Sequence, residues 1–294
     1  MKLGIVLPNQ VPYGLDGRLM LHWARVADDA GFHALGTIDK PNYDGWDPLV
    51  TLAAAAAVTE RVRLATTILQ LPNRNEVQVA EQAAVVDVLS DGRLELGVAV
   101  GARKDDYEVY GLGEAFHTRG RRFPAQIARI RKFWENARTS TPERGVAGPA
   151  PVQDPPRIWI GAMTEKTITR AIELGDGFMI GTAGSQRMAQ MAPDIRERAA
   201  GIGKTDFPVV GLAYCAVGDD RKRVLDEGAA SILRYYGRLW APADQMIHHG
   251  PAAKILEDVK AYEESGIDVL YLWPQLNEVS QVELLAEGVL PAYR

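Results

Sequence analysis

Short apolar runs alternate with longer helical patterns along the whole chain. The runs are continuously apolar, which is typical of parallel strands that are buried on both faces. Strands are expected at residues 2–7, 34–38, 62–69, 93–100, 157–162, 177–182, 209–217 and 268–274. Helical periodicity is found near residues 18–30, 47–59, 76–90, 119–137, 164–174, 185–200, 219–240 and 251–265.

This alternation predicts a parallel α/β fold built from right-handed strand–helix–strand units. Eight such units in a chain of 294 residues match a (β/α)8 TIM barrel. A doubly wound open sheet is the alternative, but no predicted strand is followed by a glycine-rich dinucleotide fingerprint. We therefore expect one barrel domain over residues 1–294, with segments 138–156 and 236–250 as excursions from the barrel.

The net charge, the apolar runs and the cysteine count of the chain limit the binding partners and the cellular location that can be expected. The net charge of −5 does not favour nucleic acid. No run of 18 apolar residues predicts a membrane span, and the apolar run near the N-terminus is too short for a signal peptide. The single cysteine, Cys215, leaves no internal disulfide and lies in an apolar run that favours buried packing. A cytoplasmic protein is expected.

The carboxyl ends of the strands are where a barrel of this kind carries its chemistry. Asp39 and Lys40 follow the second predicted strand, and the charged loop 101–106 follows the fourth. The fifth and sixth strands lead into the glycine-bearing turns 161–167 and 181–186. Helix N-termini after such turns bind phosphate through unpaired N–H groups. Thr164 and Ser185 in these turns equally suit helix caps, so both interpretations stay open.

Other catalytic patterns find little support in the sequence. No H-x-H or H-E-x-x-H pattern indicates a metal site, and no G-x-S-x-G or P-loop motif is present. His117 is expected at the surface or at a cap, whereas the tandem pair His248 and His249 either belongs to a loop or reaches the barrel mouth. The pattern favours a barrel that takes its chemistry from a phosphorylated cofactor.

Four segments together resemble the bacterial-luciferase-like flavin monooxygenases, a family that includes coenzyme F420-dependent oxidoreductases. Their order and spacing carry the resemblance, at residues 88–111, 117–123, 157–181 and 258–274. The resemblance implies a homodimer of (β/α)8 barrels with the cofactor ring at the barrel mouth. It also implies FMN or F420 as cofactor, a small organic substrate, and a separate flavin or F420 reductase as partner.

The same resemblance assigns cofactor-binding residues. The ring is expected against Thr66, Thr67 and Ile68, with a cis peptide bond at or next to Thr67–Ile68. Ala99, Val100 and Gly101 are expected to flank the ring. The phosphate is expected at Arg122, with Arg121 as the alternative, and at the turns that contain Gly161, Ala162, Met163, Thr164, Gly181 and Thr182.

The chain departs from its relatives where many of them carry a histidine after the second strand. Here Lys40 follows Asp39, so this pair is the candidate catalytic group. Lys40 would donate a proton or bind an anionic substrate, and a solvated lysine is the alternative. Val100 stands where bacterial luciferase has an arginine, and Ala102 where the F420-dependent sugar dehydrogenase has an acidic residue. Neither bioluminescence nor sugar oxidation is therefore inferred.

Segment 236–250 is expected to form a lid that selects the substrate through Trp240 and Met246. A dimer contact needs the same residue types and is the alternative. Two other function classes remain: a cofactor-binding barrel without turnover, and a lyase or aldolase that acts on a phosphorylated substrate. A lysine in a strand core would favour the aldolase, and the predicted strand cores contain none.

Overall fold

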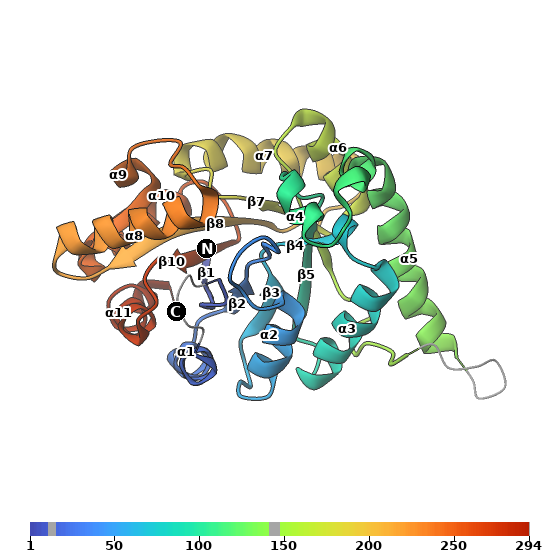
Figure 1. The fold of residues 1–294 in the computed structure, drawn as a ribbon, viewed down its shortest axis with the longest axis horizontal. Coiled ribbons are helices and arrows are strands. Elements are labelled where there is room, and N and C mark those ends of the chain that lie inside the picture. Colours follow the sequence, from blue (N-terminus) through green and yellow to red (C-terminus); the bar gives the residue numbers. More distant parts are fainter. Residues whose placement is uncertain (11–15, 141–147, 294) are drawn as a thin grey trace.

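The structure is a computed structural model that describes residues 1–10, 16–140 and 148–293. It shows a closed, all-parallel barrel with helices around it, which confirms the predicted (β/α)8 fold (Figure 1). The barrel strands are β1 (Lys2–Val6), β2 (Ala34–Thr37), β3 (Arg63–Thr66), β5 (Leu94–Ala99), β6 (Ile158–Gly161), β7 (Gly177–Ile180), β8 (Val209–Val217) and β10 (Val269–Pro274). Strand β10 pairs with both β1 and β8 and so closes the barrel.

Two short strands extend this barrel at its carboxyl end. Strand β4 (Leu69–Gln70) continues the line of β3 and pairs with β5. Strand β9 (Ile247–Gly250) pairs with the last residues of β8, on the edge that β7 occupies lower down. Strand β9 was not predicted, because its sequence is short and half polar.

The predicted strand 62–69 is interrupted at Thr67 and Ile68, but not by a cis peptide bond. That prediction is wrong: within the described residues the one cis bond is Asp154–Pro155. The chain makes its detour with trans bonds because Gly97, opposite on β5, has no side chain. The carbonyl of Thr66 occupies the place where a Cβ on Gly97 would lie. The hydroxyl of Thr66 donates to the Gly97 carbonyl at 2.6 Å.

Helices at the eight predicted ranges pack on the outside of the barrel. They are α1 (Gly17–Ala30), α2 (Pro48–Ala56), α3 (Glu76–Leu89), α5 (Arg119–Thr139), α6 (Glu165–Leu174), α7 (Ser185–Gly201), α8 (Arg221–Tyr236) and α10 (Ala252–Glu263). Helix α8 ends earlier than expected because Gly237 takes a left-handed conformation with φ 73°. The sequence missed α4 (Lys104–Glu108), α9 (Ala243–Met246), α11 (Val279–Gly288) and the 3₁₀ turns η1 (Leu71–Asn73), η2 (Gly113–Thr118) and η3 (Leu290–Tyr293).

The core has one layer between strands and helices and a second layer inside the barrel. Tyr271 of β10 is fully buried in the inner layer. A Cβ on Gly4 or Gly36 would lie 2.7 Å or 3.1 Å from its ring, so these glycines make room for it. The barrel interior is therefore filled with side chains, and the residues at the carboxyl ends of the strands pack on top of this inner layer.

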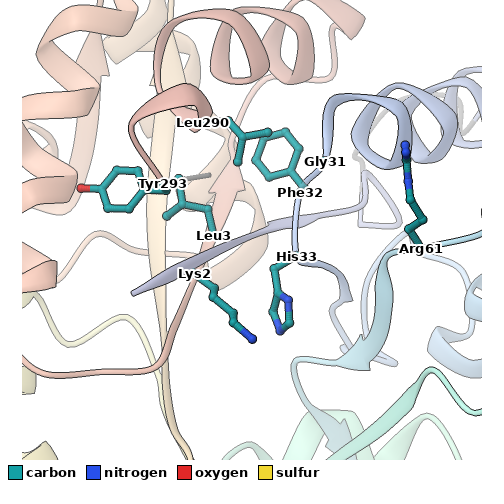
Figure 2. Close-up of a pocket in the computed structure, with 8 residues that line it drawn as sticks. All are labelled: Lys2, Leu3, Gly31, Phe32, His33, Arg61, Leu290 and Tyr293. Atoms are coloured by element: carbon teal, nitrogen blue, oxygen red, sulfur yellow. The ribbon is translucent and has the colours of Figure 1, made fainter.

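A cavity of about 380 Å³ lies at the opposite, amino end of the barrel (Figure 2). Its lining combines apolar groups with Lys2, His33 and Arg61. Burial lowers the pKa of His33 to about 4, and the nearby cations Lys2 and Arg63 add to this effect. Because TIM-barrel chemistry occurs at the carboxyl ends of the strands, this cavity is not part of the candidate site.

The predicted excursion 138–156 is described only in part, since residues 141–147 lie outside the described residues. Gln153 fixes the later part near the start of β5, where its amide donates to the Leu94 carbonyl at 2.7 Å and to Asp87 at 2.6 Å. Within the described residues, no helix combines the length and the apolar character that crossing a membrane requires.

Candidate functional site

Asp39 follows β2 and is held in a buried ion pair. Its Oδ1 accepts from Arg74 at 2.9 Å, and its Oδ2 accepts from the backbone N–H of Gln70 at 2.8 Å. Burial raises the pKa of Asp39, while Arg74 opposes this shift. Arg74 also pairs with Asp47 at 2.5 Å. Because both of its oxygens are engaged, Asp39 ties the loop after β2 to β4 and to the segment after it, a structural task beside the predicted catalytic one.

Lys40 lies next to this ion pair and is 5% exposed. Its Nζ donates to the Asn42 carbonyl at 3.2 Å. The same Nζ lies 5.4 Å from the ring centroid of Tyr43 and 5.2 Å from that of Tyr235. Burial lowers the pKa of Lys40, although Asp106 nearby opposes the shift. The alternative of a solvated lysine is wrong, because the side chain is buried. An ammonium group held between two aromatic rings and a carbonyl suits a proton donor at the mouth.

The charged loop after β5 joins several elements at the mouth. Asp106 accepts from the Gln70 side chain at 3.1 Å and from the backbone N–H of Asn42 at 3.4 Å. Arg103 pairs with Asp105 and also donates to the carbonyl of Tyr236, at the end of α8, at 3.2 Å. The strand runs into a charged loop because these side chains connect the loop after β2 and strand β4 to the end of α8.

Ile68, Ala99 and Gly161 meet at the carboxyl ends of neighbouring strands. A Cβ on Gly161 would lie 2.7 Å from Cδ1 of Ile68 and 3.8 Å from Cβ of Ala99. All three residues are half-buried, and Val100 beside them is half-buried as well. We call this set of three the platform. It offers a small apolar surface that a planar ring can contact.

Thr66 and Thr67 are buried beneath this surface and do not line it. Their hydroxyl groups donate to the carbonyls of Gly97 at 2.6 Å and Thr37 at 3.2 Å. Gly101 has a left-handed φ of 69°, and its carbonyl accepts from Arg119 at 3.0 Å. The sequence missed Arg119, although it lies in the same basic stretch as the predicted Arg122.

The two glycine turns differ in how their helices begin. Thr164 and Thr167 form a capping box at the start of α6, so Thr164 is a helix cap. Met163 beside it is 77% exposed, and Ala162 is half-buried. Helix α7 begins after Gly184 with no side-chain cap, so the cap interpretation is wrong for Ser185. The first N–H groups of α7 thus stay available near Gly181 and Thr182.

Arg122 lies in the first turn of α5. Its Nε donates to the Thr118 hydroxyl at 3.2 Å, and its Nη2 donates to the Ala115 carbonyl at 3.3 Å. These bonds fix the guanidinium while Nη1 has no partner among the described residues. Arg121 is exposed, which favours Arg122 as the phosphate-binding arginine.

A cavity of about 460 Å³ opens on the other side of the mouth, beside the carboxyl half of β8. We call it the lateral cavity. It brings together the predicted residues Thr182, Trp240 and Met246, which lie on the turn after β7 and on the segment before β9. Trp240 is 50% exposed and its ring lies 5.0 Å from that of Tyr236. The structure thus places the two predicted substrate residues at one cavity.

Cys215 and His117 take no part in the contacts described above. Cys215 is buried, and burial raises the pKa of its thiol, as expected for a packing residue. His117 is exposed and lies beside the ring of Phe116. Among residues 1–10, 16–140 and 148–293, no group of three or more His, Cys, Asp or Glu could hold a metal ion.

Comparisons with known proteins place this geometry in a family. The chain is 22% identical to the oxygenase component of the flavin-dependent trigonelline monooxygenase of Acinetobacter baylyi, over 93% of this chain and 89% of that protein. The fold matches the monooxygenase RslO1 of Streptomyces bottropensis with a TM-score of 0.80 and 21% identity, over 100% of both chains. It also matches the coenzyme F420-dependent tetrahydromethanopterin reductase of Methanopyrus kandleri with a TM-score of 0.76 and 16% identity, over 100% of this chain and 99% of that one.

The family profile of the luciferase-like monooxygenases matches residues 1–269. This match covers most of the chain and confirms both the resemblance and the expected class of enzyme, flavin- or F420-dependent oxidoreductases. The chain belongs to the luciferase-like monooxygenase family.

Proposed function

We propose that this protein is the oxygenase of an FMN-dependent monooxygenase that acts on a small organic molecule. The platform formed by Ile68, Ala99 and Gly161 carries the proposal, because it is a half-buried apolar surface at the carboxyl ends of the strands, where Gly161 leaves room for Cδ1 of Ile68. The similarity to a flavin-dependent oxygenase component extends over 93% of this chain and supports the choice of FMN. When bound, reduced FMN supplies the activation of oxygen.

The chain's own groups have separate tasks in this proposal. Arg122 binds the phosphate, whereas the uncapped first turn of α7 lines the lateral cavity. Lys40 delivers a proton at the mouth, where its burial lowers its pKa and favours release. Asp39 positions Lys40 through the fixed ion pair with Arg74. Trp240 and Met246 contact the substrate.

Coenzyme F420 is the second candidate cofactor, because the neutral side chains of Val100 and Ala102 near the platform suit either ring. Titration of the purified protein with FMN and separately with F420, followed by absorbance and fluorescence, distinguishes the two. FMN is expected to bind more tightly, and its reduced form should consume oxygen in the presence of substrate. Tighter binding of F420 would replace the proposal with hydride transfer. Binding without turnover, or no binding of either, would favour the non-enzymatic barrel or the lyase.

We propose a homodimer formed through α2 and α3, which lie side by side (Figure 1). Their outer surface exposes large apolar side chains: Val50 62%, Val77 44%, Val85 40%, Val88 46% and Leu89 55%. Exposed apolar patches of this kind mark interaction sites. Light scattering is expected to give twice the chain mass for the wild type and the chain mass for a Val85→Glu, Val88→Glu variant. A monomeric wild type would remove this interface.

A separate flavin reductase completes the proposed system, since the Acinetobacter relative is named as an oxygenase component. The chain is proposed to act in the cytoplasm as one barrel domain, which the buried free thiol of Cys215 supports. Oxygen consumption that depends on an added NADH:FMN reductase would support the two-component arrangement. Consumption with NADH and FMN alone would contradict it.

A further inference from the structure

The tandem histidines differ sharply in their contacts. His248 places Nδ1 3.2 Å from Oδ2 of Asp258 and Nε2 2.8 Å from the hydroxyl of Tyr262. The Nδ1 of His249 contacts the carbonyl of Ile247 at 2.9 Å, within its own strand. His248 and Tyr262 also line the lateral cavity, whereas His249 is not among its lining residues. One histidine of the pair, His248, is therefore hydrogen-bonded to a carboxylate and a phenol. His249 has neither contact and can serve as the control in mutagenesis.

The charges around His248 fix its tautomer. Asp258 also accepts from Lys254 at 2.5 Å. Burial favours the neutral acid, but the hydrogen bonds from His248 and Lys254 outweigh it and lower the pKa of Asp258. Burial raises the pKa of Tyr262, so its hydroxyl keeps its proton and donates it to Nε2. The proton on Nδ1 then points to Asp258, and Nε2 can accept one more.

The other groups near His248 leave this arrangement intact. Cys215 of β8 pairs in register with His248, and burial raises the pKa of its thiol, which stays neutral. Lys254 is occupied by Asp258 and Glu257. Arg187 of α7 lines the lateral cavity, and no carboxylate is among the residues that line it. An anion in the cavity would therefore meet positive charge and no acidic side chain.

The cavity has a volume and a lining that suit a small molecule with an apolar ring. Its volume of about 460 Å³ lies within the usual range for small-molecule sites. Trp240, Met246 and Tyr214 supply the apolar wall. Helices α7, α9 and α10 surround β8 on this side of the barrel (Figure 1).

We propose that the lateral cavity binds a small planar molecule with a weakly acidic hydroxyl, a phenol or an enol, and that Tyr262, His248 and Asp258 take its proton. The ligand's O–H proton passes to the Tyr262 oxygen while the Tyr262 proton passes to Nε2 of His248. Asp258 stabilises the imidazolium, and Arg187 faces the ligand oxygen that has become negative. This inference rests on the proposed function and names the class of substrate for the same enzyme.

The test uses 4-nitrophenol, whose ionised form alone is yellow, at a pH below the pKa of the free probe. Addition of wild-type protein without cofactor is expected to raise the yellow absorbance. His248→Gln and Tyr262→Phe should each reduce the bound phenolate fraction by about tenfold, which corresponds to one unit in the pKa of the probe. His249→Gln should keep the full absorbance change. Thermal unfolding of each variant checks that it is folded.

No absorbance change with the wild type would overturn the proposal, and so would an equal change in the folded His248→Gln and His249→Gln proteins. FMN titration of the same proteins separates this result from the proposed function. His248→Gln should bind FMN as the wild type does. If neither protein binds FMN while the phenolate signal depends on His248, the cofactor assignment fails and the proton relay stands.

Discussion

The two sides of the barrel mouth are built in different ways. On the side of β2, β4 and β5, charged and polar side chains bind one another: Asp39 with Arg74, and Asp106 with Gln70. On the side of β7, β8 and β9, aromatic rings and the hydrogen-bonded His248 surround the lateral cavity. The first side is closed by its own ion pairs, whereas the second has room for another molecule.

The two sides of the mouth therefore suit different tasks: one holds a cofactor in a fixed position, and the other selects the substrate. Buried ion pairs hold a single geometry because leaving one partner unpaired is costly. They therefore suit the region next to the platform, where a cofactor needs a fixed position. Apolar and aromatic walls around a cavity accept a range of shapes and suit substrate selection.

The largest effect is expected from Arg74→Met. This change leaves the buried carboxylate of Asp39 without its cation and should lower the free energy of unfolding by about 3–5 kcal/mol. Urea unfolding measures the loss. The control Arg121→Met alters an exposed arginine and should shift stability by less than about 0.5 kcal/mol. Equal stabilities for the two variants would show that the ion pair is not what holds this side together.

Lys40→Met should slow turnover by about 100-fold, or roughly 2.7 kcal/mol, because it removes the proposed proton donor. Cofactor affinity should not change. Because burial lowers the pKa of Lys40, wild-type activity should fall at alkaline pH before the ordinary lysine value of 10.5 is reached. Lys40→Arg should turn over as slowly as Lys40→Met, because arginine stays charged and does not release the proton. Wild-type turnover in Lys40→Met would remove Lys40 from the reaction.

Arg122→Ala should weaken cofactor binding by about 1.5–3 kcal/mol, the range of a hydrogen bond to a charged group. Equilibrium titration with FMN and F420 measures the change. Arg121→Ala, on the exposed neighbour, is the matched control and should bind as the wild type does. If only Arg121→Ala loses affinity, Arg121 and not Arg122 binds the phosphate.

The smallest effect is expected on the open side. Trp240→Ala with Met246→Ala should change KM or substrate selectivity, at a cost of about 1–3 kcal/mol in substrate binding. The affinity for FMN should stay within about twofold, because these residues line the lateral cavity and not the platform. Loss of the dimer with unchanged kinetics would instead make this segment an interface.

Much of the fold could be predicted because the periodicity is local. Eight apolar runs and the helices between them follow from the pattern of residues 2–274 alone. Strand β9 and helix α9 could not be predicted, since each has only four residues and no periodic signal. The break in the third strand depends on Gly97 of another strand, which no local pattern contains.

The position of the candidate site could be predicted from the sequence, but its ion pairs and hydrogen bonds could not. Placing Lys40 and loop 101–106 at the mouth needed only the rule that strand ends converge. The pairing of Asp39 with Arg74 spans 35 residues, and the bond from Arg103 to Tyr236 spans 133, so both depend on tertiary packing. Likewise, the sequence HH could not show that only His248 meets a carboxylate.

The most direct test of the account is the cofactor affinity of Gly161→Val. A valine here would place methyl groups against Ile68 and Ala99 and cover the platform, whereas Gly201→Ala adds a methyl group at a position with open space. Equilibrium titration should show that Gly161→Val has lost measurable binding of both FMN and F420 while its melting temperature shows a folded protein. Gly201→Ala should bind as the wild type does. Wild-type affinity in folded Gly161→Val would show that a planar cofactor does not lie on this platform.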